Sequence, residues 1–182
     1  MKLAIIGRPN VGKSSIINAL TQSQRVIVSP IPGTTRDAID VPFEIVTDGV
    51  RQPCVLIDTA GVRKYRRIDD TIELFSVERT KNAIARCDIV VFVLDADAGI
   101  TEQDKKIGDL ITENRKACII VVNKWDLVHD VVRKAREEEI SRRDRKGSPG
   151  APAVMTTLSE FGAWVQEHLF FLDYAPVIFA SA

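Results

Sequence analysis

A glycine-rich segment close to the N-terminus constrains the fold of this chain most. Residues 7–14 (GRPNVGKS) fit the pattern G-x-x-x-x-G-K-[ST], and they lie between an apolar run at 2–6 and a helix-forming stretch at 13–20. The two glycines let successive backbone amides turn inward toward phosphate oxygens, and the N-terminus of the following helix adds positive potential. The sequence therefore predicts a phosphate-binding loop at the end of a β-strand.

This loop supplies the first candidate binding residues. We expect Lys13 to reach the β- and γ-phosphates of a nucleotide and Ser14 to hold Mg²⁺. The residues of the segment that we expect in the site are Gly7, Asn10, Val11, Gly12, Lys13, Ser14 and Ser15.

Composition favours one globular domain over residues 1–182. The chain has 25 basic and 25 acidic residues and is 45% hydrophobic, which excludes a disordered chain and a strong global field for nucleic acid or anionic lipid. Its longest apolar runs are about six residues, far short of the roughly 20 that span a bilayer, so we expect a cytoplasmic protein with no membrane partner. Cys54, Cys87 and Cys118 are odd in number and widely spaced, which favours reduced core thiols.

Short β-branched runs alternate with longer helical stretches along the chain. The runs predict strands of a parallel sheet at 2–6, 55–57, 89–94, 119–122 and 177–179. The stretches between them predict helices at 13–20, 71–85, 102–112, 131–143 and 158–169. This alternation is typical of an α/β fold with helices on both faces of the sheet.

One strand departs from the parallel pattern. Residues 41–47 alternate between apolar and polar, and Asp48 and Gly49 form a strong hairpin signal, so this strand should pair antiparallel with 52–57. We therefore expect a mostly parallel six-stranded sheet with one antiparallel edge strand. Residues 142–152 carry no apolar anchor and predict a loop.

The segment 123–126 (NKWD) follows a predicted strand, where ligands bind in doubly wound sheets. The Asp126 carboxylate can accept hydrogen bonds from N1–H and the N2 amino group of guanine, whereas adenine offers neither donor there. The sequence thus favours GTP, with Asn123 and Lys124 beside the base. Ser181 and Ala182 follow the last strand, where a backbone amide could bind the guanine carbonyl.

Two further segments suit a γ-phosphate and a metal ion. Asp58 ends a predicted strand and could hold Mg²⁺ through water, while Gly61 lets its amide approach the γ-phosphate. Thr34 and Thr35 lie in a segment between these motifs and offer hydroxyls that could respond to the phosphate and to Mg²⁺.

Together these motifs resemble the second GTPase domain of the bacterial tandem GTPases of the Der/EngA family. The flanks at 25–30 (RVIVSP), 99–104 (GITEQD) and 171–176 (FLDYAP) match as well as the motifs do. The resemblance implies a P-loop GTPase fold, GTP and GDP as ligands, slow GTP hydrolysis and a role in assembly of the large ribosomal subunit. It also implies rRNA contacts, a preceding GTPase domain and a C-terminal KH-like domain in the full-length protein.

The chain departs from this family pattern in its extent. It ends directly after the base-binding residues Ser181 and Ala182, so we expect a truncated domain whose final helix is missing. The stretch from Asn123 to Ser181 is longer than the family leads us to expect, with the excess around 142–157, and the resemblance does not account for this excess.

Val62 follows Gly61 at the position where Ras-like enzymes carry a glutamine that orients water. A valine cannot do this, so we expect Lys13, Thr35, Gly61 and Asn10 to carry catalysis. Related enzymes use a potassium ion held partly by an asparagine at the position of Asn10. Alternatively, Asn10 is present because asparagine tolerates unusual backbone angles in a tight loop.

Other functions remain open on sequence grounds. The domain could be a guanine-nucleotide-binding interaction module with negligible hydrolysis, or an ATP-dependent enzyme that uses Asp95 as its acid. The basic stretches 63–67 and 133–146 could contact RNA or could be solvated surface. For the aromatic residues we favour core packing over an exposed partner surface; these are Trp125, Phe161, Trp164 and Phe170.

Overall fold

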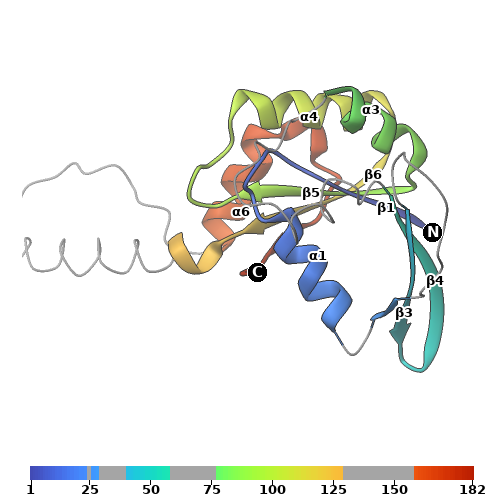
Figure 1. Ribbon diagram of the computed structural model, residues 1–182. Helices are drawn as coiled ribbons and strands as arrows, with labels where there is room; N and C mark the ends of the chain where they lie inside the picture. The colour runs from blue at the N-terminus through green and yellow to red at the C-terminus, as the bar shows by residue number, and fades with distance from the viewer. Residues whose placement is uncertain (24–25, 29–39, 58–76, 129–157) are drawn as a thin grey trace, which may run out of the picture.

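The computed structural model describes residues 1–23, 26–28, 40–57, 77–128 and 158–182. Within these ranges seven strands form one sheet in the order β2-β3-β4-β1-β5-β6-β7 (Figure 1). The strands are β1 (Lys2–Ile6), β2 (Val26–Val28), β3 (Val41–Thr47), β4 (Val50–Ile57), β5 (Ile89–Asp95), β6 (Ala117–Asn123) and β7 (Val177–Phe179). Strands β4, β1, β5, β6 and β7 run parallel, which confirms the predicted α/β arrangement.

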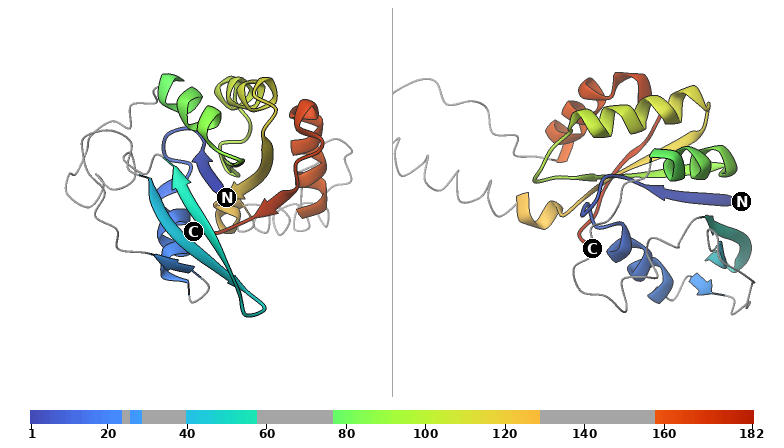
Figure 2. Two further views of the ribbon diagram at one scale, coloured as in Figure 1. Left: turned by 90° about the vertical axis from the view of Figure 1, so that its right-hand side faces the viewer. Right: turned by 45° about the horizontal axis from the view of Figure 1, so that its top comes forward.

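Helices cover both faces of this sheet, as expected. Helix α1 lies on one face, while α3, α4 and α6 lie on the other (Figure 2). The helices are α1 (Lys13–Gln22), α3 (Val77–Arg86), α4 (Glu102–Glu113) and α6 (Leu158–His168), with a short 3₁₀ turn, η2 (Phe170–Leu172). The predicted helix at 131–143, the loop at 142–152 and the first part of the helix predicted at 71–85 lie outside the described residues.

The hairpin forms where the sequence predicted it. Asp48 and Gly49 have φ angles of 51° and 77°, the left-handed conformation that a two-residue turn between twisted strands requires. Strand β3 pairs antiparallel with β4 in the register that joins Thr47 to Val50.

The sheet has one more strand than the six that we expected. Strand β2 pairs antiparallel with the outer side of β3, so β3 is the second strand from this edge. With three residues, β2 is too short to show an alternating pattern, and its pairing partner rather than its own sequence defines it.

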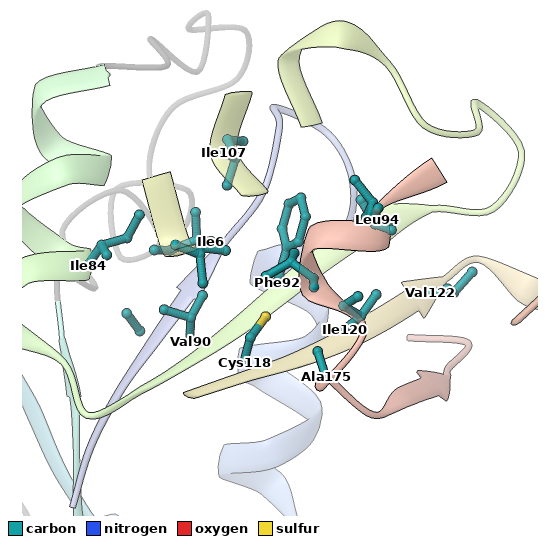
Figure 3. Packing of buried hydrophobic residues seen from close by; sticks show 14 of the residues in the cluster. Ile6, Ile84, Val90, Phe92, Leu94, Ile107, Cys118, Ile120, Val122 and Ala175 are labelled. Carbon is teal, nitrogen blue, oxygen red and sulfur yellow. The ribbon is translucent and has the colours of Figure 1, made fainter. Parts of the chain in front are cut away.

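The main core lies between the sheet and the α3, α4 and α6 layer (Figure 3). Phe92 of β5 and Ile120 of β6 are fully buried there against Ile84, Ile107 and other apolar side chains. A smaller cluster joins Val11 and Ile16 to the opposite face of β5 and β6. The phosphate loop is therefore anchored by Val11, whose side chain packs in the core between α1 and the sheet.

All three cysteines are buried and free, which confirms the expectation of reduced core thiols. Burial raises the pKa of the Cys118 thiol to about 12 and also raises the pKa of Cys87. Both thiols therefore stay protonated near neutral pH and are poor nucleophiles.

The expectation of core packing holds for most of the aromatic residues. Phe161 is buried, and Trp125 and Trp164 pack against the core. For Phe170 the expectation was wrong, because 71% of its surface is exposed in η2, where its ring contacts only Phe171 among the described aromatic pairs. No helix in the described ranges is both long and apolar enough to cross a membrane.

We expect Ile120→Ala to lower the free energy of unfolding by about 2–5 kcal/mol, because it leaves a cavity in the packed core. Ile178→Ala is the matched control: Ile178 lies on the neighbouring strand β7 and is 49% exposed, so its truncation should cost much less. Urea unfolding of both variants measures the difference, and equal losses would contradict this description of the core.

Candidate nucleotide-binding site

The phosphate loop connects the end of β1 to the first turn of α1. Gly12 precedes α1 with φ of 92°, a conformation that favours glycine, and no acidic side chain lies in the first turn of the helix. At Gly7 a β-carbon would overlap with the backbone carbonyl of Val93 on β5. The loop thus lies tightly against the sheet, and the helix N-terminus beside it suits an anion.

Lys13 is held by the backbone of the same loop. Its ammonium group donates hydrogen bonds to the carbonyl oxygens of Gly7, at 3.1 Å, and Arg8, at 2.6 Å. The charge therefore lies beside the loop whose amides would bind phosphate. Ser14 is half-buried in the first turn of α1, and Ser15 next to it is exposed.

Asn10 adopts φ of 63° within the loop. Asparagine is among the residues that enter this left-handed region most readily, so its presence has a conformational reason independent of any ligand. This agrees with the interpretation in which asparagine is present at position 10 for its backbone conformation.

Asn123 connects the phosphate loop to the loops that follow β6 and β7. Its side chain is fully buried; Nδ2 donates to the carbonyl of Val11 at 3.0 Å, and Oδ1 accepts from the amide of Ala182 at 3.1 Å. A β-carbon at Gly12 would overlap with the same amide group. Segments 7–14, 123–126 and 180–182 therefore meet at one edge of the sheet, as the sequence predicted.

Lys124, with φ of 62°, forms an ion pair with Asp95 at the end of β5, with 2.6 Å between Nζ and Oδ2. Asp95 also accepts hydrogen bonds from the amides of Asp97 and Ala98. Partial burial by itself would raise the pKa of Asp95, but the hydrogen bonds from Lys124 and these amides hold its pKa below its ordinary value. Asp95 is therefore a carboxylate that orients Lys124, a role that our sequence analysis missed.

Asp126 lies three residues after the end of β6 and is exposed, so its side chain is accessible to a ligand. Its backbone amide donates to the hydroxyl of Ser181 at 3.2 Å, and the amide of Trp125 donates to the carbonyl of Ala180 at 3.2 Å. The Trp125 ring packs edge-on against Phe161 and Phe179. The helical turn that carries Asp126 is thus held by residues 180–181 and by aromatic side chains of α6 and β7.

Arg8 forms a second ion pair near these segments, and its acidic partner is fully buried. Its Nε lies 2.7 Å from Oδ2 of Asp104 in α4, and Nη2 donates to the carbonyl of Gly99 at 3.1 Å. Asp104 belongs to a capping box in which its carboxylate accepts from the amide and hydroxyl of Thr101. The spacing of Thr101 and Asp104 is a capping signal that sequence analysis could have found, whereas their contact with Arg8 requires the tertiary fold.

The remaining candidate residues fall outside the described ranges; they are Thr34, Thr35, Asp58 and Gly61. Among the described residues, no group of three or more His, Cys, Asp or Glu side chains could hold a metal ion. Ser14 supplies a hydroxyl oxygen, a ligand type that Mg²⁺ accepts, so the described part of the site is compatible with that ion.

A parallel sheet with a glycine-bounded loop, a lysine and a helix N-terminus at its edge defines a P-loop nucleotide-binding domain. A family model described as 50S ribosome-binding GTPase matches residues 2–124. The chain belongs to this GTPase family.

Curated relatives extend the match over the whole chain. GTPase Der of Heliobacterium modesticaldum is 47% identical over 182 residues, which cover 100% of this chain and 35% of that protein. GTPase Der of Akkermansia muciniphila is also 47% identical over 182 residues, and 34% of its length is covered. The chain therefore spans about a third of the length of these relatives.

A crystal structure of an Era variant from Aquifex aeolicus, bound to GDP.AlF4-, is similar with a TM-score of 0.58. The match covers 99% of this chain and 50% of that chain at 24% sequence identity. The likeness supports the P-loop GTPase fold.

We expect Asn123→Ala to lower the free energy of unfolding by about 1–3 kcal/mol, because the buried carbonyl of Val11 loses its partner. Asn114→Ala is the control: this asparagine also donates to a backbone carbonyl, but it is exposed at the end of α4, so we expect a loss of about 0.5 kcal/mol. Thermal melts compare the two, and a smaller loss for Asn123→Ala would contradict its linking role.

Proposed function

We propose that this domain binds GTP, hydrolyses it to GDP and phosphate, and acts as a nucleotide-dependent switch in assembly of the large ribosomal subunit. The observation that carries the proposal is the side chain of Asn123, whose two polar atoms join the phosphate loop to the segment after β7. Segments 7–14 and 123–126 are thereby held at a fixed distance from each other. A nucleotide could then bind with its phosphates at Lys13 and its base at Asp126.

The guanine preference rests on Asp126. Its carboxylate accepts from N1–H and the N2 amino group of guanine, and the adenine edge has no matching pair of donors. Ser181 and Ala182 lie beside it, with the Ser181 hydroxyl already accepting from the Asp126 amide. A site built on such hydrogen bonds can discriminate against a base that lacks the donors by a factor of as much as ~10⁴–10⁵.

In hydrolysis, a water oxygen attacks the γ-phosphorus, the bond to the bridging oxygen breaks, and GDP leaves. Lys13 and the loop amides stabilise the negative charge that develops on the phosphate oxygens. Mg²⁺ would be held by Ser14 with Thr35 and Asp58, and it would neutralise further charge there. Gly61 would offer its amide to the γ-phosphate.

A potassium ion at Asn10 is the proposed source of the charge neutralisation that Val62 cannot give. The ion would be held by the Asn10 side chain and by carbonyls of the segment before Thr34. Since Asn10 also has a conformational role in the loop, a test must separate these two roles.

The ribosomal role rests on the family and on the similarity to GTPase Der. We place the chain as the second of two tandem GTPase domains, in a cytoplasmic protein that also carries a KH-like domain. Large-subunit rRNA is the proposed partner, contacted mostly through those other parts.

We expect Asp126→Asn to weaken GTP binding by about 10²–10⁴-fold and to favour xanthosine triphosphate, because the C2 oxygen of xanthine requires a donor. Asp109→Asn, an exposed change on α4, serves as the control and should leave both affinities as they are. Calorimetry measures both, and unchanged GTP affinity in Asp126→Asn would remove this residue from the site.

We expect single-turnover hydrolysis to be faster in potassium than in sodium at equal ionic strength, and Asn10→Gly to lose this difference. Glycine keeps the left-handed backbone of residue 10 and removes only the amide side chain. GTP binding should persist in the variant. A wild-type rate that ignores potassium contradicts the ion assignment, and no hydrolysis in either salt would indicate a binding module instead of an enzyme.

A further inference from the structure

The ion pair between Arg8 and Asp104 has no part in the chemistry described so far. It lies at the edge of the site, and it is well shielded: the Asp104 side chain has 0% exposure and the Arg8 side chain 16%. Burying two charges costs free energy that their attraction repays only in good geometry, and apolar residues of similar size often serve stability as well. Stability alone is therefore a weak explanation for this pair.

Capping of α4 is also an incomplete explanation. The Thr101 hydroxyl accepts from the Asp104 amide, and Oδ2 of Asp104 accepts from the amide and hydroxyl of Thr101, so the box closes without Arg8. Yet Arg8 extends across to the same oxygen and to the carbonyl of Gly99. The guanidinium thus attaches the phosphate loop to the first turn of α4 and to the connection that precedes this helix.

The backbone of Arg8 connects this attachment to Lys13. The carbonyl oxygens of Arg8 and Gly7 both accept hydrogen bonds from the Lys13 ammonium, and the one to Arg8 is the shorter, at 2.6 Å against 3.1 Å for Gly7. Rotation of the Arg8 peptide would move that acceptor and the ammonium with it. A side chain fixed at Asp104 and Gly99 opposes such rotation.

We propose that Arg8 is a positioning residue for GTP hydrolysis: its contacts with Asp104 and Gly99 hold the phosphate loop so that Lys13 meets the γ-phosphate in reactive geometry. The inference rests on the proposed GTPase function. It assigns α4 a role at the site through Asp104.

The test compares two carboxylate-to-amide changes in one helical turn. Asp104→Asn removes the charge that faces Arg8 and keeps an oxygen for Thr101. Glu102→Gln removes the charge of an exposed pair with Lys105, at 2.8 Å, and is the matched control. We measure hydrogen exchange of residues 7–12 without nucleotide, single-turnover hydrolysis, and GDP affinity.

For Asp104→Asn we expect faster exchange in residues 7–12, a hydrolysis rate lower by about tenfold, and a GDP affinity changed by less than about threefold. Glu102→Gln should match the wild type in all three. Arg8→Met should reproduce Asp104→Asn, and the double variant should be no slower than either, because both changes remove one interaction. Arg8→Lys keeps the charge and should recover part of the rate.

A lower melting temperature with unchanged exchange and rate would overturn the inference and leave the pair a purely structural role. Equal losses in hydrolysis and GDP affinity would also overturn it, since they indicate general damage to the loop. If the wild-type domain does not hydrolyse GTP, the proposed function fails by itself. The exchange comparison still decides whether the ion pair controls the loop.

Discussion

The buried amide of Asn123 is the interaction on which the arrangement of the site depends. Its donor and acceptor atoms bind two different segments, and both partners are backbone groups. The amide therefore holds the backbone of these segments in place whatever side chains residues 11 and 182 carry. Strand β6 holds Asn123 rigidly because it lies between β5 and β7 in parallel register. The sheet thereby brings three separate segments together at the carboxyl ends of its parallel strands.

Much of this could be predicted because the signals are local. Periodicity and punctuation defined β1, β3, β7 and α4 almost to the residue, and the loop motif required glycine where the backbone has φ of 92°. Strand β2 was missed because three residues carry no period. The pairs of Arg8 with Asp104 and Lys124 with Asp95 were missed because each joins segments that only the tertiary fold brings together.

These two ion pairs have a common location. Asp95 ends β5 and Asp104 lies in the first turn of α4, so the two acidic partners lie on either side of the connection between these elements. Arg8 belongs to the phosphate loop, and Lys124 belongs to segment 123–126, which is proposed to recognise the base. Asp95 and Asp104 thus neutralise Lys124 and Arg8, respectively. Since the net charge of the chain is zero, the electrostatic potential at the site depends on such nearby pairs and not on an overall charge.

The packing of Trp125 has an optical consequence. The chain contains two tryptophans, and Trp125 begins the helical turn that carries Asp126, with its ring edge-on to Phe161 and Phe179. Trp164 lies one aromatic neighbour away, against Phe161. A rearrangement of segment 123–126 should therefore change the surroundings of the Trp125 indole ring. The domain thus carries a native fluorophore next to Asp126, the residue proposed to recognise the base.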